Sequence, residues 1–362
     1  MRGGVDSSVA AKLLCDEGYE CIGCTMKLYD NCDAGLPRGR TCCSLDDVED
    51  ARSVAFSLGM RYYVFNFKDD FHEKVIKKFA SGYLRGQTPN PCIDCNRYMK
   101  FDKLFERAKL LGCDKIATGH YARIEFDGRK YRLKKALDKS KDQSYVLYML
   151  TQEQLAHALF PLGSLHKTDT RAIADTAGFS SAHKPDSQDI CFVPDGDYAA
   201  AIERLAGLKA PCGNFIDASG KVIGTHRGIT HYTVGQHRGL GLSLPERRYV
   251  CSIDAENSTV TLGGNDELYS STAEVRGFNW ISGETPAEPI RCTAKIRYRQ
   301  PEQPATEIAH KDGSITIYID VSLDGKSKEL RYSKKIPMLG TNMPSKSISV
   351  NKEEWRILRE TN

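Results

Sequence analysis

The sequence of 362 residues contains no run of about 18 consecutive apolar residues, the length that a membrane-spanning helix needs. Its first residues have neither the apolar core of a secretion signal nor the arginine-rich character of a presequence. We therefore expect a cytoplasmic protein with no membrane partner, in a compartment that keeps thiols reduced. The composition of 40% hydrophobic and 27% charged residues excludes wholesale disorder.

Two common phosphate-binding spacings are also absent. The glycine-rich residues 3–8 fit neither G-x-x-x-x-G-K-[ST] nor G-x-G-x-x-G. Gly3 and Gly4 nevertheless stand directly before a predicted helix, whose N-terminal amides attract anions. From the residues alone, a different type of phosphate-binding loop and an ordinary helix cap both remain open.

The order of predicted elements over the first 180 residues indicates a parallel sheet covered by helices. Apolar spacing and glycine stops predict helices at residues 9–14, 45–58, 71–84, 100–111, 152–159 and 168–176, and strands at residues 21–29, 62–67 and 115–120. After residue 194 the elements shorten and glycine becomes frequent. Short strands such as those at residues 293–298 and 314–319 predict a C-terminal barrel or sandwich. We expect domains at residues 1–198, 199–268 and 269–362.

The chain has 13 cysteines, which cannot all pair with one another. In a reduced compartment, clustered cysteines indicate metal binding or catalysis rather than a disulfide framework. Cys92 and Cys95 form a C-x-x-C motif that follows two prolines and stands just before the helix predicted at residues 100–111. A helix N-terminus favours the thiolate form of cysteine. Cys191 lies in a polar segment far downstream, and the remaining cysteines are most simply small packed residues.

The positive charge of the chain is concentrated towards its C-terminus. Residues 291–362 carry 14 Lys or Arg and nine Asp or Glu, so their net charge is +5, whereas the whole chain has +4. A polyanionic partner would explain this distribution, and so would a solvated lysine-rich surface.

The motifs carry a resemblance to a known family. The segment G-G-V-D-S-S at residues 3–8 resembles the pyrophosphate loop of ATP-pyrophosphatases, with Arg2 where the family pattern has serine and without the strand that normally precedes the loop. From Gly3 to about Arg299 the chain resembles the tRNA-specific 2-thiouridylases. This resemblance rests on T-P-N-P-C-I-D-C-N-R-Y-M-K-F at residues 88–101, A-T-G-H-Y-A-R at 117–123, K-D-Q-S-Y at 141–145, K-P-D-S-Q-D-I-C-F-V at 184–193 and T-V-G-Q-H-R-G-L-G at 233–241.

The resemblance implies an α/β protein with a parallel-sheet nucleotide-binding domain like that of the adenine nucleotide alpha hydrolases. A small central domain and a C-terminal β-barrel-like domain would follow. It implies transfer of AMP from ATP to the C2 oxygen of the wobble uridine, after which sulfur replaces that oxygen. Two alternatives remain: an inactive tRNA-binding or sulfur-carrier relic, suggested by the missing first strand, and another pyrophosphate-loop enzyme.

The same resemblance assigns roles to individual residues. Cys95 would be the nucleophile and Cys191 the persulfide carrier, with Asn90, Pro91 and Cys92 around the flipped-out target base. ATP, with Mg²⁺, would contact Gly3, Gly4, Val5, Asp6, Ser7, Ser8, Met26 and Gly119. The tRNA would contact His120, Lys141, Asp142, Gln143, Arg297, Tyr298 and Arg299. The implied partners are tRNAs for Lys, Glu and Gln, and a cysteine desulfurase or sulfur-relay protein.

Cys92 stands where many members of the family have aspartate. Together with Cys95 and Cys191 it would supply three thiolates for a [4Fe–4S] cluster with one open iron site for hydrosulfide. Sulfur transfer through a persulfide and transfer through such a cluster both remain open, and the third thiol favours the cluster. After Asp320 the chain also lacks the Pro-Gly-Gln turn of the family, so no tRNA contact is assigned there.

Overall fold

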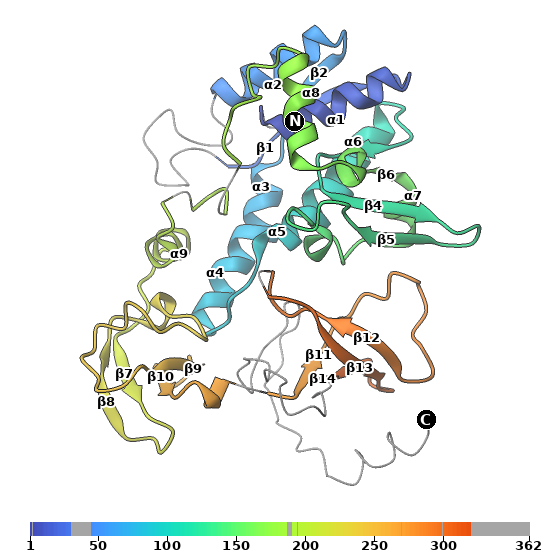
Figure 1. Cartoon of the computed structure of the whole chain (residues 1–362). Helices are drawn as coiled ribbons and strands as arrows, with labels where there is room; N and C mark the ends of the chain where they lie inside the picture. The colour runs from blue at the N-terminus through green and yellow to red at the C-terminus, as the bar shows by residue number, and fades with distance from the viewer. Residues whose placement is uncertain are drawn as a thin grey trace.

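The structure is a computed structural model that describes residue 1 and residues 3–29, 45–186, 190–193, 195–268, 270–298 and 300–319 (Figure 1). Arg299 and the tail beyond residue 319 lie outside the described residues, as does the segment in which the Pro-Gly-Gln turn was expected. Within the described part, the N-terminal half mixes helices and strands, and two β-rich parts follow it (Figure 1).

The chain begins with two β-α units. They consist of α1 (Val5–Asp16), β1 (Ile22–Lys27), α2 (Leu45–Ser57) and β2 (Arg61–Asn66). Strand β1 pairs in parallel with β2, with Ile22 opposite Arg61, as the alternation of helices and strands predicts. Gly18 adopts a positive φ of 87° and allows the chain to turn from α1 towards β1.

Two long helical segments follow. The first is α3 (Lys68–Phe71), the π-helical η1 (His72–Ile76) and α4 (Lys77–Leu84); the second is α5 (Pro91–Asp94), the π-helical η2 (Cys95–Lys103) and α6 (Leu104–Leu110). The second segment starts nine residues before the helix predicted from residue 100. Asn90 caps it by accepting the backbone N–H of Cys92 at 3.1 Å, and Pro91 suits the first helical position. The C-x-x-C motif therefore lies within the helix rather than before it.

The rest of the α/β part adds a second parallel pair and a hairpin. Its elements are β3 (Ile116–Ala117), β4 (Ala122–Phe126), β5 (Tyr131–Lys135), η3 (Ser144–Val146), α7 (Gln152–His157), β6 (Ala158–Leu159), η4 (Pro161–Ser164) and α8 (Lys167–Thr176). Strands β3 and β6 pair in parallel. Strand β3 is shorter than the strand predicted at residues 115–120, and β6 takes the last two residues of the helix predicted at residues 152–159. The antiparallel hairpin of β4 and β5 was not predicted; Asp127 accepts the N–H groups of Arg129 and Lys130 at its turn.

The remaining described residues form two small sheets. After α9 (Tyr198–Ala206), the strands β7 (Gly213–Ile216), β8 (Val222–His226), β9 (Tyr249–Asp254) and β10 (Thr259–Gly263) pair in the order β8-β7-β10-β9, with η5 (Ile229–His231) and η6 (Asp266–Leu268) beside them. The strands β11 (Thr272–Val275), β12 (Ile290–Ala294), β13 (Gln303–Ala309) and β14 (Ile315–Ile319) form an antiparallel sheet in the order β11-β14-β13-β12. The strand predicted at residues 293–298 is shifted towards the N-terminus, so Arg297 and Tyr298 follow it.

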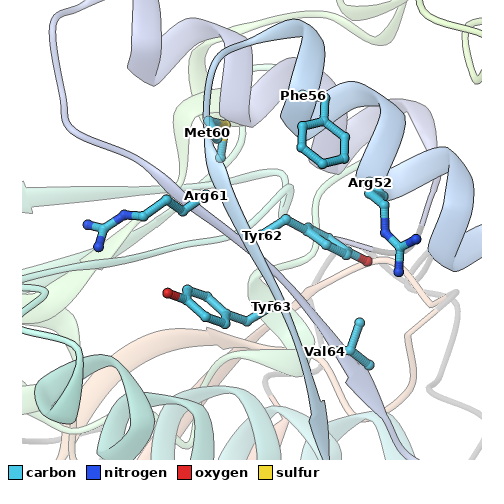
Figure 2. Close-up of a pocket in the computed structure, with 7 residues that line it drawn as sticks. All are labelled: Arg52, Phe56, Met60, Arg61, Tyr62, Tyr63 and Val64. Carbon is cyan, nitrogen blue, oxygen red and sulfur yellow. The ribbon is translucent and has the colours of Figure 1, made fainter.

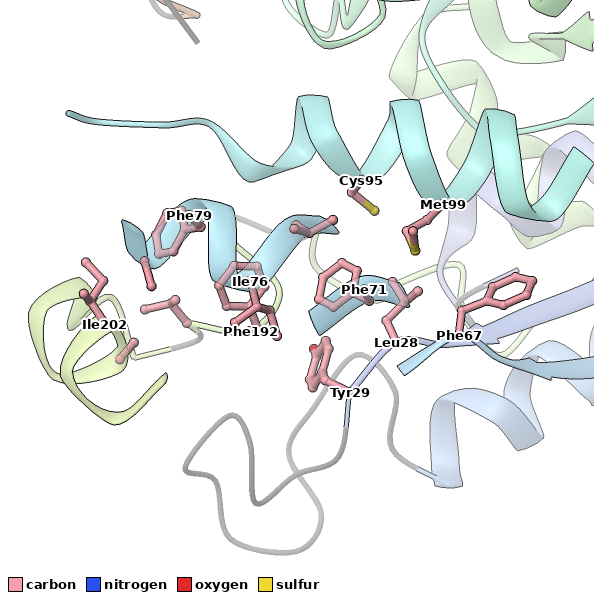
Figure 3. Close-up of a cluster of buried hydrophobic side chains, with 14 of the residues drawn as sticks. Leu28, Tyr29, Phe67, Phe71, Ile76, Phe79, Cys95, Met99, Phe192 and Ile202 are labelled. Carbon is pink, nitrogen blue, oxygen red and sulfur yellow. The ribbon is translucent and has the colours of Figure 1, made fainter. Parts of the chain in front are cut away.

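A hydrophobic cluster joins several helical elements and positions the candidate site. Its fully buried side chains include Phe71, Ile76, Phe79 and Met99, and Cys95 belongs to the same cluster (Figure 3). Ile202 of α9 packs into it from the start of the following part of the chain. No helix in the described ranges is long and apolar enough to cross a membrane.

Candidate active site

The glycine-rich loop is held tightly against α2. Gly3 has a φ of +61°, and a Cβ atom at this position would lie 2.6 Å from the backbone oxygen of Asp47. Both observations require glycine. Gly4 is the N-cap of α1, and the hydroxyls of Ser7 and Ser8 donate to its carbonyl oxygen at 3.2 and 3.1 Å. The segment is therefore a tight turn that leads straight into a helix N-terminus.

Gly119 brings the end of β3 against the same turn. A Cβ atom on Gly119 would lie 2.8 Å from the backbone carbon of Asp6 and 2.9 Å from the nitrogen of Ser7. Only glycine allows this approach, because real Cβ contacts do not come so close. Met26 lies in β1 and packs against the hydrophobic cluster that contains Cys95. The structure thus brings Gly119 and residues 3–8 together.

Asp6 belongs to a network of charged side chains. Its Oδ1 accepts from Lys167 Nζ at 2.6 Å and from the Tyr121 hydroxyl at 3.0 Å. Lys167 also forms an ion pair with Asp186 at 2.8 Å. The carboxylate of Asp186 forms two further ion pairs, with Lys141 at 2.9 Å and with Arg171 at 3.2 Å. Burial alone would raise the pKa of Asp186, but the hydrogen bonds from Lys167 and Lys141 lower it to about 2.

Sequence reasoning missed several members of this network. Lys167 and Arg171 stand in no motif that was singled out, and the exposed side-chain fraction of Lys167 is only 11%. Asp186 does lie in the K-P-D-S-Q-D segment, which was the available signal. Lys167 is nearly buried between the carboxylates of Asp6 and Asp186. The sequence does not predict this arrangement, because the three residues lie in segments that only the fold brings together.

Cys95 and Cys191 pack against one hydrophobic cluster. Cys95 is 7% exposed and contributes to the cluster with Phe71 and Met99 (Figure 3). Cys191 is half-buried and packs against the same hydrophobic cluster, and its carbonyl oxygen accepts a hydrogen bond from the hydroxyl of Tyr29. Segments almost one hundred residues apart in sequence therefore converge at one place.

Cys92 has a different environment from these two cysteines. It is exposed, while Cys95 is buried. Within the described ranges, which include Cys92, Cys95 and Cys191, no three His, Cys, Asp or Glu side chains are grouped so that they could hold a metal ion. Three thiolates are the right kind of ligand for an iron–sulfur cluster, and Cys92 differs from Cys95 in its exposure.

A buried polar chain extends from the cysteine helix to the end of β3. Asn96, the residue after Cys95, donates through Nδ2 to the carbonyl of Val146 at 2.8 Å, and its Oδ1 accepts from Lys100 Nζ at 2.8 Å. Lys100 Nζ lies 3.3 Å from His120 Nε2, and Thr118 Oγ1 lies 2.7 Å from His120 Nδ1. The ring of His120 is 7% exposed.

The predicted tRNA contacts 141–143 make specific contacts within the protein. Lys141 pairs with Asp186, and Asp142 accepts the N–H of Ala136 at 2.9 Å. Gln143 Oε1 accepts the N–H of Tyr121 at 2.9 Å, and its own N–H donates to the carbonyl of Tyr121 at 2.8 Å. These bonds fix the loop beside the residue that follows His120.

Arg297 and Tyr298 lie where the three parts of the chain meet. Arg297 donates to the carbonyl of Val234 at 2.9 Å, and the Tyr298 hydroxyl lies 3.4 Å from the carbonyl of Asp142. The hydroxyl of Tyr145 donates to the carbonyl of Ile296 at 2.7 Å. Arg299, predicted as the third member of this group, lies outside the described residues.

A pocket elsewhere on the α/β part has no connection with these residues. Figure 2 shows it between α2 and β2, and none of the predicted site residues contributes to it. Its lining consists of Arg52, Phe56, Met60, Arg61, Tyr62, Tyr63 and Val64.

Family profiles and curated relatives cover most of the chain. Residues 1–195 match a tRNA methyl transferase HUP domain, residues 205–264 a tRNA methyl transferase PRC-barrel domain, and residues 270–327 an aminomethyltransferase beta-barrel domain. The chain is 49% identical over 324 residues to the tRNA-specific 2-thiouridylase MnmA of Acetivibrio thermocellus, covering 88% of this chain and 90% of that protein. The chain belongs to the tRNA-specific 2-thiouridylase family.

Other 2-thiouridylases show the same degree of similarity. The enzyme of Clostridioides difficile is 47% identical, with 88% of each chain covered, and that of Geotalea uraniireducens is 50% identical, with 83% of this chain and 80% of that protein covered. Membership of the 2-thiouridylases confirms the resemblance and the fold class predicted from the motifs.

Proposed function

We propose that the protein is an ATP-dependent tRNA-uridine 2-sulfurtransferase that converts the wobble uridine of tRNA to 2-thiouridine. The observation that carries this proposal is the joining of two sites in one α/β part: a glycine turn at the N-terminus of α1, and two cysteines that share one buried cluster. Identity of 49% with a protein named for this activity supports it. We further propose domain boundaries at residues 198 and 268, and a cytoplasmic location.

ATP would bind where the loop and Gly119 meet. Backbone amides at the start of α1 suit the phosphates, which the helix dipole also attracts. Mg²⁺ prefers carboxylate oxygens, and Asp6 offers one. Both hydrogen bonds described for this carboxylate go to Oδ1, so Oδ2 is available, and its side chain is 35% exposed.

Adenylation would turn the C2 oxygen of uracil into a leaving group. That oxygen attacks the α-phosphorus of ATP, the bond to the β-phosphate breaks, and pyrophosphate leaves with the electron pair. Asn90, Pro91 and the exposed Cys92 would line the pocket for the base, which must leave the anticodon stack to react. His120 at the end of β3 would face the reacting base.

Sulfur would then travel from Cys191 to the base. The terminal sulfur of a Cys191 persulfide attacks C2 of the adenylated uridine, and AMP leaves with the electrons of the C2–O bond. The thiolate of Cys95 attacks the remaining Cys191 sulfur, which releases the new thiocarbonyl and forms a Cys95–Cys191 disulfide. A cellular thiol or dithiol reductant reopens this disulfide, and a cysteine desulfurase or relay protein reloads Cys191.

The packing of the cysteines favours this persulfide route over a [4Fe–4S] cluster. Cys95 and Cys191 pack against one cluster of buried hydrophobic side chains, whereas Cys92 is exposed. Anaerobic purification followed by iron and sulfide analysis separates the two routes. Iron-free, active protein supports the persulfide route, and about four irons per chain that are lost in Cys92→Ala would contradict it.

The tRNA would approach along the loop and the later domains. Lys141, Asp142, Gln143, Arg297, Tyr298 and Arg299 are its proposed contacts, and the tRNAs for Lys, Glu and Gln are its proposed substrates. Cationic side chains there would make binding depend on salt. Lys141→Ala should therefore weaken tRNA binding and reduce the slope of log Kd against log salt.

One assay tests the function and its alternatives together. Purified protein is incubated with ATP, a persulfide donor and unmodified tRNA, and the digested RNA is analysed for thionucleosides. We expect 2-thiouridine at the wobble position. Binding of tRNA without any thionucleoside would support a sulfur-carrier or tRNA-binding relic, and a thiolated cytidine would indicate another pyrophosphate-loop enzyme.

A further inference from the structure

Tyr121 connects three segments around the proposed phosphate site. Its hydroxyl donates to Asp6 Oδ1 at 3.0 Å and lies 2.9 Å from Thr170 Oγ1. Its backbone N–H and carbonyl both pair with Gln143, through the side-chain oxygen and the main-chain N–H of that residue. Tyr121 is 2% exposed, so its ring has little room to move. A rigid residue therefore joins the carboxylate of the phosphate loop to the rest of the α/β part.

Both contacts of the Asp6 carboxylate fall on the same oxygen atom. Lys167 Nζ donates to Oδ1 at 2.6 Å, beside the hydroxyl of Tyr121. Two donors on Oδ1 restrict the rotation of the carboxylate, while Oδ2 makes no hydrogen bond or ion pair within the described residues. The side chain of Asp6 is 35% exposed, so a ligand can reach it. Carboxylates that bind metal ions are typically held in this way by hydrogen bonds from neighbouring residues.

The phenol of Tyr121 is suited to remain a donor. Burial raises the pKa of Tyr121, the hydrogen bond with Thr170 opposes that rise, and the nearby carboxylate of Asp6 adds to it. The hydroxyl therefore keeps its proton at neutral pH. Lys167 Nζ lies 5.6 Å from the centre of the Tyr121 ring, so the two donors approach Oδ1 from adjacent positions.

We propose that Tyr121 is a positioning residue that orients the carboxylate of Asp6 so that Oδ2 is available to the Mg²⁺ of Mg·ATP. This inference rests on the function proposed above and deepens the account of its ATP site. Tyr121 touches neither the metal ion nor the phosphates, and it acts through Asp6. Loss of its hydroxyl leaves every metal ligand in the chain but allows the carboxylate to rotate, which weakens metal-dependent nucleotide binding.

The test measures nucleotide binding by the full chain in Tyr121→Phe, which removes only the hydroxyl. A non-hydrolysable ATP analogue is titrated at a series of Mg²⁺ concentrations, and Mn²⁺ bound together with the analogue is counted by electron paramagnetic resonance. Losing a hydrogen bond to a charged group corresponds to about 10–100-fold in an equilibrium constant, and Lys167 still holds Oδ1 in the variant. The Mg²⁺ concentration at half-saturation should therefore rise at least threefold, while metal-free binding of the analogue changes less than twofold.

Two further variants separate orientation from folding. Tyr145→Phe also removes a tyrosine hydrogen bond, to the carbonyl of Ile296, in which Asp6 has no part. Its Mg²⁺ concentration at half-saturation should stay within 1.5-fold of the wild type. Asp6→Ala removes the carboxylate itself, so the addition of Tyr121→Phe to it should cause less than a 1.5-fold further change, because a residue that acts only through Asp6 has nothing left to orient.

A rise of less than threefold in Tyr121→Phe would overturn the proposal, as would wild-type binding that does not depend on Mg²⁺. Equal losses with and without the metal, together with a lowered thermal midpoint, would also overturn it, because that pattern belongs to a merely structural tyrosine. An effect of Tyr121→Phe that persists in Asp6→Ala would show that the residue does not act through this carboxylate. These measurements use neither tRNA nor sulfur. If the wild type binds Mg·ATP analogue but forms no 2-thiouridine, the proposed function fails while the role of Tyr121 is decided separately.

Discussion

Replacing Lys78 by methionine removes the cation that faces Asp94 inside the C-x-x-C motif. Asp94 is 5% exposed, and Lys78 Nζ of α4 lies 2.6 Å from its Oδ1. Arg97 and the hydroxyl of Tyr148 are the other titratable groups that act on this carboxyl. Burial raises the pKa of Asp94, and the hydrogen bond from Lys78 opposes that rise. The variant leaves a nearly buried carboxylate without its hydrogen-bonded cation.

The size of the effect follows from the burial of the pair. Breaking a fully buried ion pair by removing one partner costs about 3–5 kcal/mol. Because the side chain of Lys78 is 34% exposed, water screens the pair, and we expect about 2–3 kcal/mol. For a domain of this size that corresponds to a fall in the thermal midpoint of about 4–12 °C.

The loss should depend on pH in a defined direction. In the variant the pKa of Asp94 rises further, so the folded state binds its proton more tightly than the unfolded state does. Below about pH 3.9 the carboxyl is neutral in both states and the difference from wild type vanishes. Above that pH the destabilisation grows until Asp94 ionises in the folded variant, and it is then constant.

Thermal midpoints between about pH 3.5 and pH 8 measure this prediction, starting below the ordinary pKa of an aspartate, with Lys77→Met as the matched control. Lys77 precedes Lys78 in α4 and pairs with Glu73, and both of their side chains are more than half exposed. Its replacement should shift the midpoint clearly less than Lys78→Met does above about pH 5, because water screens an exposed pair. Equal shifts in the two variants, or a Lys78→Met shift that does not grow with pH, would refute the reasoning.

Three further changes have distinct expected outcomes. Gly119→Ala places a Cβ atom 2.8 Å from the backbone of Asp6. The KM for ATP should therefore rise at least tenfold, while tRNA affinity stays within twofold of wild type. Unchanged ATP kinetics would show that this close approach is unimportant. Tyr145→Phe removes the bond to the carbonyl of Ile296, so limited proteolysis should release the C-terminal sheet sooner, by a factor that corresponds to about 1 kcal/mol, and an identical digestion rate would contradict this. Cys191→Ser should abolish 2-thiouridine formation but leave pyrophosphate release measurable, whereas Cys292→Ser should retain full thiolation; loss in both or in neither variant would contradict the assigned role.

Much of the fold was predictable because local signals and tertiary packing agree. Strand β2 is aromatic and β-branched, and it forms as expected, with a shift of one residue. The helix that starts at Pro91 begins nine residues before the predicted one, because Asn90 caps it and Pro91 occupies its first position. The hairpin of β4 and β5 was not predicted, although A-R-I-E-F and Y-R-L-K-K alternate between apolar and charged residues as a half-exposed strand does.

Some residues of the candidate site could likewise be predicted from the sequence, and others could not. Gly3, Cys95 and Cys191 stand in dense motifs, so sequence alone singled them out as candidates. Lys167 stands in none of the quoted motifs and has no local mark of its own. Its partner Asp6 is 161 residues away along the chain, and such a distance in sequence leaves no trace in spacing or periodicity.

The path of sulfur is the most direct test of the account. Protein loaded by a cysteine desulfurase with [³⁵S]cysteine is stripped of free label and then given ATP and unmodified tRNA under anaerobic conditions. The account predicts reductant-labile label on Cys191 that moves into 2-thiouridine in one turnover, with no iron in the protein. Label held in an iron–sulfide centre, or 2-thiouridine formed at full rate by Cys191→Ser, would contradict it.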